Sequence, residues 1–348
     1  MNQRDGRKIL PGFVDLHVHF REPGFSPKET ILTGSRAALK GGYIAVVTMP
    51  NLDPAPDSLL NLQVQLDLIK QQAQLPVFPV GSITVGQAGQ GQLSDIEALA
   101  PYVCGFSDDG VGVNDAALMQ EAMVRAKACG KPIIAHCEDL RFPGNESEWC
   151  PLAQDLELAA QTGCHYHVCH VSTKESVELI RQAKKDGVCV SAETAPHYLV
   201  LCNEDVQDDG RFKMNPPIRS HQDQSALLAG VLDGTIDCIA TDHAPHTAEE
   251  KSKGMAGSMF GIVGLETAFP VLYTKLVRGG VMTLDQLVAV MAHNPRELLK
   301  RWTGDKFMFG GSVLWDLDTC YTIDPDKFET MGRATPFAGW EVYGVAMT

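Results

Sequence analysis

The chain reaches its first apolar segment at Phe13-Val14-Asp15-Leu16-His17-Val18-His19-Phe20. Seven further short apolar segments follow, at residues 43–49, 77–83, 102–107, 132–136, 165–171, 188–194 and 237–241. They are rich in Val, Ile and Cys and do not alternate cleanly with polar residues, a pattern typical of strands buried on both faces. Eight such strands predict a (β/α)8 barrel, with a doubly wound open sheet as the competing fold.

The segments between these strands have the spacing of amphipathic helices. Residues 29–40 place apolar side chains on one stripe that stops at Gly41-Gly42, and residues 58–72 repeat Leu or Ile every three or four positions. The S-x-x-E pattern at 172–175 predicts a capping box before the next helix, and the pattern at 283–286 opens a later helix in the same way.

The predicted barrel domain covers residues 13–302. Residues 1–12 and 303–348 lie outside it and form the second predicted unit, a small flanking β-structure. The tail contains two β-like pieces, at 312–317 and 340–346, which we expect to pair with the N-terminal segment.

Composition excludes several classes of protein. The 348 residues include 29 Lys and Arg against 43 Asp and Glu, a formal net charge of −14, which disfavours binding to nucleic acid or to an anionic membrane. No apolar run reaches the roughly 18 residues of a membrane span, and the polar N-terminus lacks a signal core, so we expect a cytoplasmic protein. The ten cysteines contain no C-x-x-C pair, which favours reduced thiols over disulfides or a zinc knot.

Histidines and aspartates end five of the apolar segments. His17 and His19 end the first and share one face by strand alternation, and Asp108-Asp109 follows the fourth. His136, His170 and Asp242 end the fifth, sixth and eighth segments. Taken singly, each is explained as a core histidine or a helix-capping aspartate, and this is the better explanation for an isolated H-x-H. Together, at the end of the barrel where such folds carry their chemistry, they predict a metal centre.

The mixture of imidazole and carboxylate fits Zn²⁺, with Mn²⁺ or Co²⁺ as alternatives. There are more candidate ligands than one tetrahedral zinc uses, so we expect two ions that share a carboxylate. Cys137 is left out, because strand alternation points it to the face opposite His136.

Eight motifs span most of the chain. They read P-G-F-V-D-L-H-V-H-F-R-E-P-G at 11–24, M-P-N at 49–51, F-S-D-D-G at 106–110, A-H-C-E at 135–138, H-V-S-T-K at 170–174, M-N-P-P at 214–217, T-D-H-A-P-H at 241–246 and F-G-I-V-G-L-E at 260–266. As an ordered set they resemble the dihydroorotases of the amidohydrolase superfamily. The first or the seventh motif alone also resembles hydantoinases and allantoinases.

The resemblance implies ligands for two metal ions. It assigns His17, His19 and Asp242 to one ion, and His136 and His170 to the second. In much of the superfamily a carboxylated lysine on the fourth strand bridges the two ions. This chain has no lysine there and resembles the branch in which an aspartate takes that place, with Asp109 favoured over Asp108.

The same resemblance implies the reaction, a reversible cyclisation of N-carbamoyl-L-aspartate to L-dihydroorotate in pyrimidine biosynthesis. In the hydrolytic direction a metal-bound hydroxide would attack the cyclic amide, with Asp242 as general acid and base. The implied substrate contacts are His19, Arg21, Asn51, Asn215, His246, Phe260 and Gly261. Arg21 can bind the ring carboxylate of dihydroorotate bidentately, and Asn51 can add a neutral hydrogen bond.

Three segments depart from the family pattern. The region before residue 13 and the segments 138–149 and 304–317 are shorter than the family usually has, so we expect the flanking β-sandwich to be incomplete.

Two alternatives to an active dihydroorotase are a dihydropyrimidinase or allantoinase, whose neutral rings give Arg21 no carboxylate to bind, and an inactive dihydroorotase-like partner of aspartate transcarbamoylase. The retained ligand set argues against the second. A homodimer, and association with that transcarbamoylase, are left open.

The other histidines receive lesser roles. We expect His165, His167, His221 and His293 to serve packing or solvent contacts. His197 would support the site, and His243 either orients a ligand or is a plain loop residue.

Overall fold

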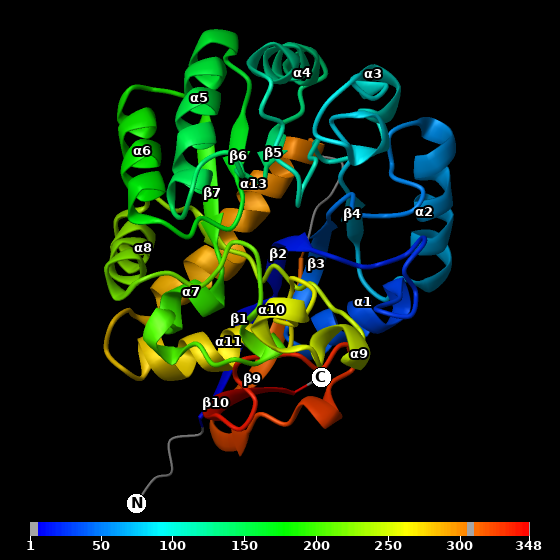
Figure 1. Cartoon of the computed structure of the whole chain (residues 1–348). Coiled ribbons are helices and arrows are strands. Elements are labelled where there is room, and N and C mark those ends of the chain that lie inside the picture. The colour runs from blue at the N-terminus through cyan, green and yellow to red at the C-terminus, as the bar shows by residue number, and fades with distance from the viewer. Residues whose placement is uncertain (1–5, 305–309, 348) are drawn as a thin grey trace, which may run out of the picture.

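Parallel strands alternate with helices along most of the computed structural model, which describes residues 6–304 and 310–347 (Figure 1). One sheet has the order β2-β3-β4 and another the order β5-β6-β7-β8, and every pairing within them is parallel. These strands are β2 (Phe13–Val18), β3 (Tyr43–Thr48), β4 (Val77–Pro79), β5 (Ile133–Ala135), β6 (Tyr166–Val168), β7 (Val190–Thr194) and β8 (Cys238–Ile239).

Single parallel bridges join the two sheets into a barrel. Phe106 pairs with Gly81 on one side and Ile133 on the other, and His243 pairs with Val18 across the other gap. The predicted strand at 102–107 therefore contributes bridges but no strand of its own. Just beyond Phe106, the Asp108 carboxylate accepts hydrogen bonds from the backbone amides of Ile83 and Thr84. The predicted α/β barrel is confirmed.

Helices surround the strands in Figure 1. The first eight are α1 (Ile31–Lys40), α2 (Leu59–Gln72), α3 (Ile96–Leu99), α4 (Ala116–Ala128), α5 (Glu146–Thr162), α6 (Lys174–Lys185), α7 (Pro196–Val200) and α8 (His221–Asp233). The later ones are α9 (Ala248–Lys251), α10 (Gly254–Gly257), α11 (Ala268–Leu272), α12 (Leu284–Val288) and α13 (Asn294–Thr303). Shorter 3-10 turns are η1 (Val85–Gln87), η2 (Asn203–Asp205), η3 (Gly210–Phe212) and η6 (Pro325–Lys327), and η4 (Tyr273–Val277) and η5 (Ala289–His293) are π-helical.

Side-chain caps set the starts of several helices. Ser58 caps α2, and Thr283 forms a capping box with Gln286 at α12, as the sequence predicts. The capping box predicted to start at residue 172 is wrong by one position. Thr173 is the residue that caps α6, and its side chain accepts a hydrogen bond from Ser176 N. Ser172 instead donates its hydroxyl to the buried carboxylate of Glu148.

Alternate residues of the strands fill the barrel interior. The apolar cluster inside consists of Val14, Leu16, Ala45, Val47, Met49, Phe78, Val80, Cys104, Ile134, Cys169, Cys238, Leu299 and Trp302. The last two belong to α13, which runs behind the strands in Figure 1. The backbone carbonyl of Trp302 accepts from Lys131, just before β5, and Asn294 donates to the Asp237 carbonyl, just before β8. Helix α13 therefore closes the N-terminal end of the barrel and leaves the C-terminal end for the loops.

Both ends of the chain contribute to a small antiparallel sheet, as predicted. Its order is β1-β9-β10, with β1 (Arg7–Pro11), β9 (Ser312–Thr322) and β10 (Glu341–Met347). Trp315 on β9 is buried against Phe13 and Phe269, with ring centroids 5.7 and 4.2 Å away, so this sheet packs on the outside of the barrel.

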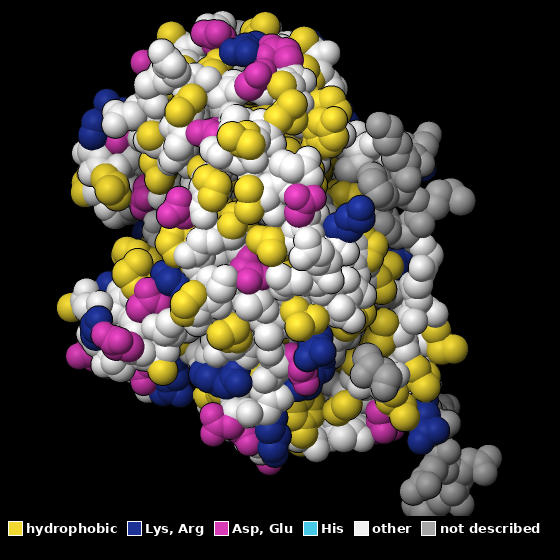
Figure 2. All heavy atoms as spheres, turned by 90° about the vertical axis from the view of Figure 1, so that its right-hand side faces the viewer, with side chains coloured by type: hydrophobic (Ala, Val, Ile, Leu, Met, Phe, Trp, Pro, Cys, Tyr) yellow, Lys and Arg dark blue, Asp and Glu magenta, His cyan; other side chains and the backbone are white. Residues whose placement is uncertain are grey.

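The described surface carries charges of both signs. On the face drawn in Figure 2, Lys and Arg side chains are interspersed with Asp and Glu and with scattered apolar residues. All ten cysteines are free. None of the helices formed by residues 6–304 and 310–347 has the length and apolarity that crossing a bilayer would require.

Because Leu299 is fully buried where α13 closes the barrel, Leu299→Ala should lower the free energy of unfolding by about 2–5 kcal/mol. Leu60→Ala is the matched control, since Leu60 on α2 is 80% exposed, and it should change stability by no more than about 0.5 kcal/mol. Urea unfolding of both variants checks this, and equal losses would contradict the role given to α13.

Candidate metal centre and active site

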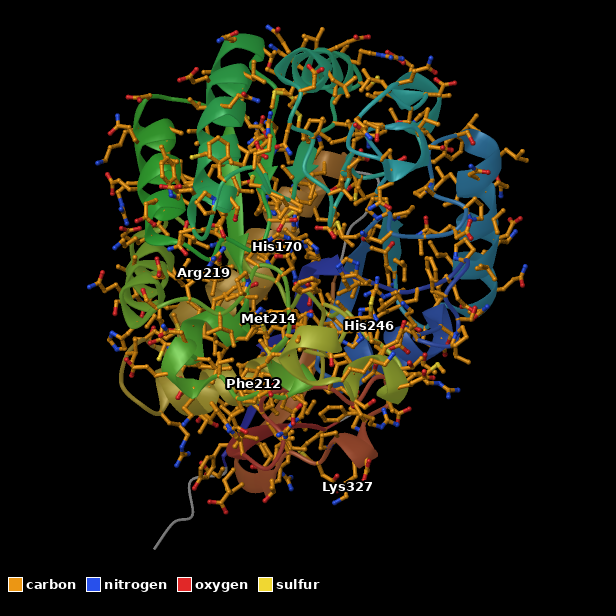
Figure 3. The ribbon with its side chains drawn as sticks, in the orientation of Figure 1. His170, Phe212, Met214, Arg219, His246 and Lys327 are labelled. Carbon is orange, nitrogen blue, oxygen red and sulfur yellow. The ribbon has the colours of Figure 1, made fainter. Side chains whose placement is uncertain are left out.

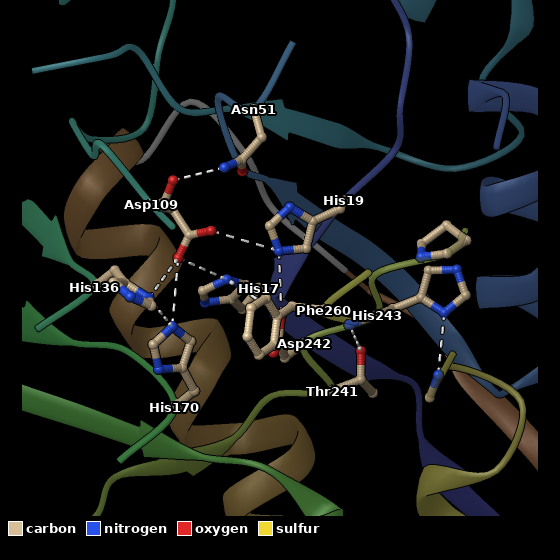
Figure 4. Close-up of polar contacts among 12 residues, drawn as sticks. His17, His19, Asn51, Asp109, His136, His170, Thr241, Asp242, His243 and Phe260 are labelled. Atoms are coloured by element: carbon tan, nitrogen blue, oxygen red, sulfur yellow. Dashed lines mark hydrogen bonds and ion pairs between the residues drawn. The ribbon is translucent and has the colours of Figure 1, made fainter. Parts of the chain in front are cut away.

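Residues from three distant strand ends meet at the C-terminal end of the barrel (Figure 4). His17 Nε2, from β2, lies 3.3 Å from Asp109 Oδ1 and 3.7 Å from Asp242 Oδ1. His19 Nε2 lies 3.1 Å from Asp242 Oδ1 and 3.6 Å from Asp109 Oδ2. One side of the site therefore has two imidazoles facing two carboxylates.

The histidines that follow β5 and β6 form the other side. His136 Nδ1 lies 3.0 Å from His170 Nε2. Asp109 Oδ1 is 3.4 Å from His170 Nε2 and 3.8 Å from His136 Nδ1. Asp109 thus lies between the two pairs of histidines, the position that a bridging carboxylate requires.

These separations suit metal ions. Ligand atoms about 2.0–2.2 Å from a tetrahedral Zn²⁺ are about 3.3–3.6 Å apart, close to most of the distances above. His17, Asp109 and His170 form one group able to hold an ion, and His17, His19 and Asp242 form another. His17 Nε2 is buried and has no hydrogen-bond partner among the described residues, as a nitrogen reserved for an ion would. The donor set therefore fits one or two divalent cations.

The two neighbouring aspartates have different surroundings. Asp108 accepts hydrogen bonds from the backbone amides of Ile83, Thr84 and Gly89, so its carboxylate is used in holding a loop. Asp109 faces the four histidines and its carboxylate contacts them. The geometry supports Asp109, and not Asp108, as the shared ligand.

Two candidate ligands have strained backbones. His170 has a φ of 33° and Asp242 a φ of 49°, in a region that non-glycine residues rarely adopt. Such a conformation costs about 1–3 kcal/mol and persists where the surrounding structure enforces it. Here it lies at two strand ends, at the residues whose side chains enter the site.

The site holds its carboxylates ionised. Burial alone would raise the pKa of Asp242, but the hydrogen bond with His19 and the nearby charges of His17 and His19 bring it to about 2. Burial likewise opposes ionisation of Asp109, and His17 outweighs it by holding the pKa of that carboxyl well below its usual value. Both groups are therefore anions at neutral pH.

A pocket of about 380 Å³ opens beside these ligands. All seven predicted substrate contacts line it: His19, Arg21, Asn51, Asn215, His246, Phe260 and Gly261. Figure 3 shows His170 and His246 on opposite sides of this region, whereas Lys327 lies apart at the flanking end of the molecule. The candidate ligands His136, His170, Asp109 and Asp242 line the same pocket.

Arg21 is held in place at one wall. Its Nε donates to the Pro245 carbonyl at 3.3 Å, and one terminal nitrogen lies 3.4 Å from His246 Nε2. Burial lowers the pKa of Arg21 to about 10, so the guanidinium stays cationic at neutral pH. Burial and the nearby charges of Arg21 and Lys28 lower the pKa of His246 to about 4, so this histidine is neutral. This wall therefore places the positive charge of Arg21 beside a neutral imidazole.

Sequence reasoning missed several lining residues. Phe25, Lys28, Leu52, Gln87 and Met259 also line the pocket. Glu138 was also missed, although its carboxylate accepts from Asn215 Nδ2 at 3.0 Å and lies 3.4 Å from His136 Nε2. The A-H-C-E motif containing Glu138 was a signal, whereas nothing in the sequence separates Lys28 from a surface lysine.

The remaining histidines differ in their surroundings. His243 pairs with Glu29 at 3.3 Å and lies outside the ligand cluster. His197 is buried, and burial lowers its pKa to about 4. His165 and His167, expected to be packing residues, bond to one another through Ser191 within the barrel.

Comparison with known proteins settles the family. The family model described as "Dihydro-orotase-like" matches residues 6–147. A dihydroorotase of Anoxybacillus flavithermus is 49% identical over 98% of this chain and 85% of its own length. The chain belongs to the dihydroorotase family. A Fusobacterium nucleatum dihydroorotase is 45% identical over 97% of this chain and 85% of its own length.

Solved structures agree with the fold. An L-hydantoinase (dihydropyrimidinase) from Arthrobacter aurescens superposes with a TM-score of 0.86 at 24% identity, over 98% of this chain and 83% of its own. The inactive dihydroorotase-like domain of a Chaetomium thermophilum CAD-like multifunctional protein gives a TM-score of 0.73 at 22% identity, over 98% of this chain and 91% of its own. Families of this kind are metal-dependent, in agreement with the candidate ligand clusters.

Replacing the two adjacent aspartates should separate their roles. Asp109→Asn should weaken Zn²⁺ binding by at least about tenfold, because it removes a negative charge from the cluster. Asp108→Asn should weaken it less, since this carboxylate contacts backbone amides and not the four histidines. Titration against a coloured chelator measures both, and the reverse ranking would exchange the two roles.

Proposed function

We propose that this chain catalyses the reversible ring closure of N-carbamoyl-L-aspartate to L-dihydroorotate. The observation that carries the proposal is one pocket with a buried arginine on one wall and a group of histidines and carboxylates on the other. The arginine suits the carboxylate of the substrate, and the opposite group suits hydrolysis of its cyclic amide. The name shared by relatives that match nearly the whole chain supports the same reaction.

We propose two Zn²⁺ ions as the cofactor. His17, His19 and Asp242 would hold one, His136 and His170 the other, and Asp109 would be shared between them. Bound zinc supplies Lewis-acid polarisation of a carbonyl oxygen and makes water ionise near neutral pH. The imidazole and carboxylate donors fit this ion, and the short contacts among them fit its bond lengths.

Asp242 is proposed as the general base and acid. It lines the pocket and is ionised, so in the hydrolytic direction it can accept the proton of the attacking water. It then returns this proton to the ring nitrogen as the C–N bond breaks. In the biosynthetic direction Asp242 takes a proton from the carbamoyl nitrogen as this nitrogen attacks the carbon of the carboxylic acid group. Asp242 then delivers that proton to the departing hydroxyl group, which leaves as water.

Arg21 is proposed to orient the ring. The Pro245 carbonyl holds the guanidinium by accepting from its Nε, and the terminal N–H groups can meet the substrate carboxylate in a forked arrangement. His246 donates to the Phe260 carbonyl at 2.7 Å and so holds the loop that covers this wall. Asn51 and Asn215 add neutral amides from the other sides of the pocket.

Two observations favour this reaction over the alternatives. Dihydropyrimidines and allantoin have no ring carboxylate and would leave the buried cation Arg21 without a partner. An inactive partner protein would have no need of a complete set of candidate ligands around a pocket. Association with a second copy of the chain or with aspartate transcarbamoylase is compatible with the proposed activity.

A substrate panel tests the proposal directly. The zinc-loaded protein should hydrolyse dihydroorotate with a far higher kcat/KM than dihydrouracil or allantoin, because only the first can use Arg21. Ring opening followed by ultraviolet absorbance gives the three values. Equal or better turnover of the neutral rings would overturn the assignment.

Two substitutions should affect different kinetic constants. Arg21→Met should raise KM for dihydroorotate by about 10- to 100-fold with a smaller change in kcat, because it removes a charged hydrogen bond to the bound substrate. Asp242→Asn should lower kcat by at least about 100-fold. Arg125→Met, which removes a surface pair with Glu97, is the control and should leave both constants unchanged. A near-normal kcat in zinc-loaded Asp242→Asn would refute the acid–base role.

A further inference from the structure

A line of polar side chains runs through the barrel interior, below the metal cluster and among apolar neighbours. Its members are Glu193 and Ser191 on β7, His167 on β6, His165 just before β6, and Trp302 on α13. His167 and Glu193 are completely buried and Ser191 nearly so. Because buried polar groups are costly unless they are bonded, a continuous set of them in a barrel core calls for an explanation.

Each member contacts the next at hydrogen-bond distance. Trp302 Nε1 lies 3.2 Å from His165 Nδ1, and His165 Nε2 lies 2.8 Å from Ser191 Oγ. Ser191 Oγ is also 2.8 Å from His167 Nδ1, and His167 Nε2 is 3.2 Å from Glu193 Oε2.

The line ends at a candidate metal ligand. The other carboxylate oxygen, Glu193 Oε1, lies 2.8 Å from His17 Nδ1. The opposite nitrogen of the same ring, His17 Nε2, faces Asp109 and Asp242. The line therefore joins the closed end of the barrel to the site at the open end.

The chemistry of its two ends sets the direction of every hydrogen bond. An indole nitrogen can only donate, so His165 Nδ1 must accept and the proton of this neutral ring lies on Nε2. Ser191 then accepts from His165 and donates to His167 Nδ1, which leaves the His167 proton on Nε2. Burial lowers the pKa of His165 to about 3, in agreement with a neutral ring.

Glu193, at the end of the line beside His17, completes this order of donors and acceptors. Glu193 accepts on both oxygens, from His167 Nε2 and from His17 Nδ1. With its proton on Nδ1, His17 has a lone pair on Nε2, which is the form of the ring that binds a metal ion.

We propose that Trp302, His165, Ser191, His167 and Glu193 act as a chain of positioning residues that fixes the tautomer and orientation of His17 for metal binding. The inference rests on the proposed metal site and extends it to residues as far away as α13. Glu193 acts directly on His17, and the others hold Glu193 in place. A line of side chains that served only to fill the core would not need to end at a ligand.

Metal affinity, measured without substrate, is the first test. Glu193→Gln should weaken Zn²⁺ binding by about 10- to 100-fold, because an amide cannot accept hydrogen bonds at both positions. Glu29→Gln is the matched control, since Glu29 is a buried carboxylate that pairs with His243, which is outside the ligand set. It should leave the affinity unchanged. Titration of the folded proteins against a coloured chelator gives each value.

A substitution in the middle of the line of polar side chains tests whether residues distant from His17 also influence metal affinity. Ser191→Ala should weaken Zn²⁺ binding by about three- to tenfold, because His167 and then Glu193 lose a constraint. Ser82→Ala is its control, since Ser82 is equally buried and its hydroxyl has no partner among the described residues. Affinities equal to wild type in both Ser191→Ala and Glu193→Gln would overturn the proposal, even if thermal stability falls.

Nitrogen-15 NMR of histidine-labelled, zinc-loaded protein reads the tautomers themselves. His165 and His167 should carry their protons on Nε2, and His17 should carry its proton on Nδ1. A proton on Nδ1 of His167 would overturn the proposal. Because neither the NMR nor the zinc titration uses substrate, failure of the dihydroorotase assay would leave this inference standing, and the reverse also holds.

Discussion

The convergence of four imidazoles on the Asp109 carboxylate is the interaction on which the rest of the site depends. Asp109 is nearly fully buried, and a charge in that position is costly unless compensating groups surround it. His17 and His19 approach it from one side and His136 and His170 from the other. The barrel supplies this compensation by bringing four strand ends together, so the fold and the ligand set depend on one another.

Asp108 shows how one residue can secure its neighbour. Its carboxylate accepts hydrogen bonds from the backbone amides of Ile83 and Thr84, in the segment after β4. This contact fixes the backbone from which Asp109 projects. Burial raises the pKa of Asp108 while the pKa of Asp109 is lowered, so two adjacent carboxyls differ in their proton affinity because of their partners.

Much of this arrangement could be predicted from the sequence. Buried parallel strands have a strong apolar signature, and residues at their C-terminal ends must meet at one end of a barrel, so His17, His136 and His170 could be placed together. The strand predicted at 102–107 is present only as two single bridges at Phe106, because an apolar pattern does not show how regularly a segment pairs with its neighbours. The sequence likewise predicts only packing or solvent contacts for His167, because it does not show which side chains the neighbouring strands place beside that ring.

The loop at the mouth of the pocket contains two residues that tolerate substitution and one glycine that does not. Phe260 and Met259 are 55% and 47% exposed, so replacing their side chains would leave no cavity in the core. Gly261 has a φ of 130°, and a Cβ there would lie 2.6 Å from the Ala244 carbonyl oxygen. Redesign of this entrance for bulkier cyclic amides therefore has two positions open to variation, on a backbone whose course is set by the glycine that follows them.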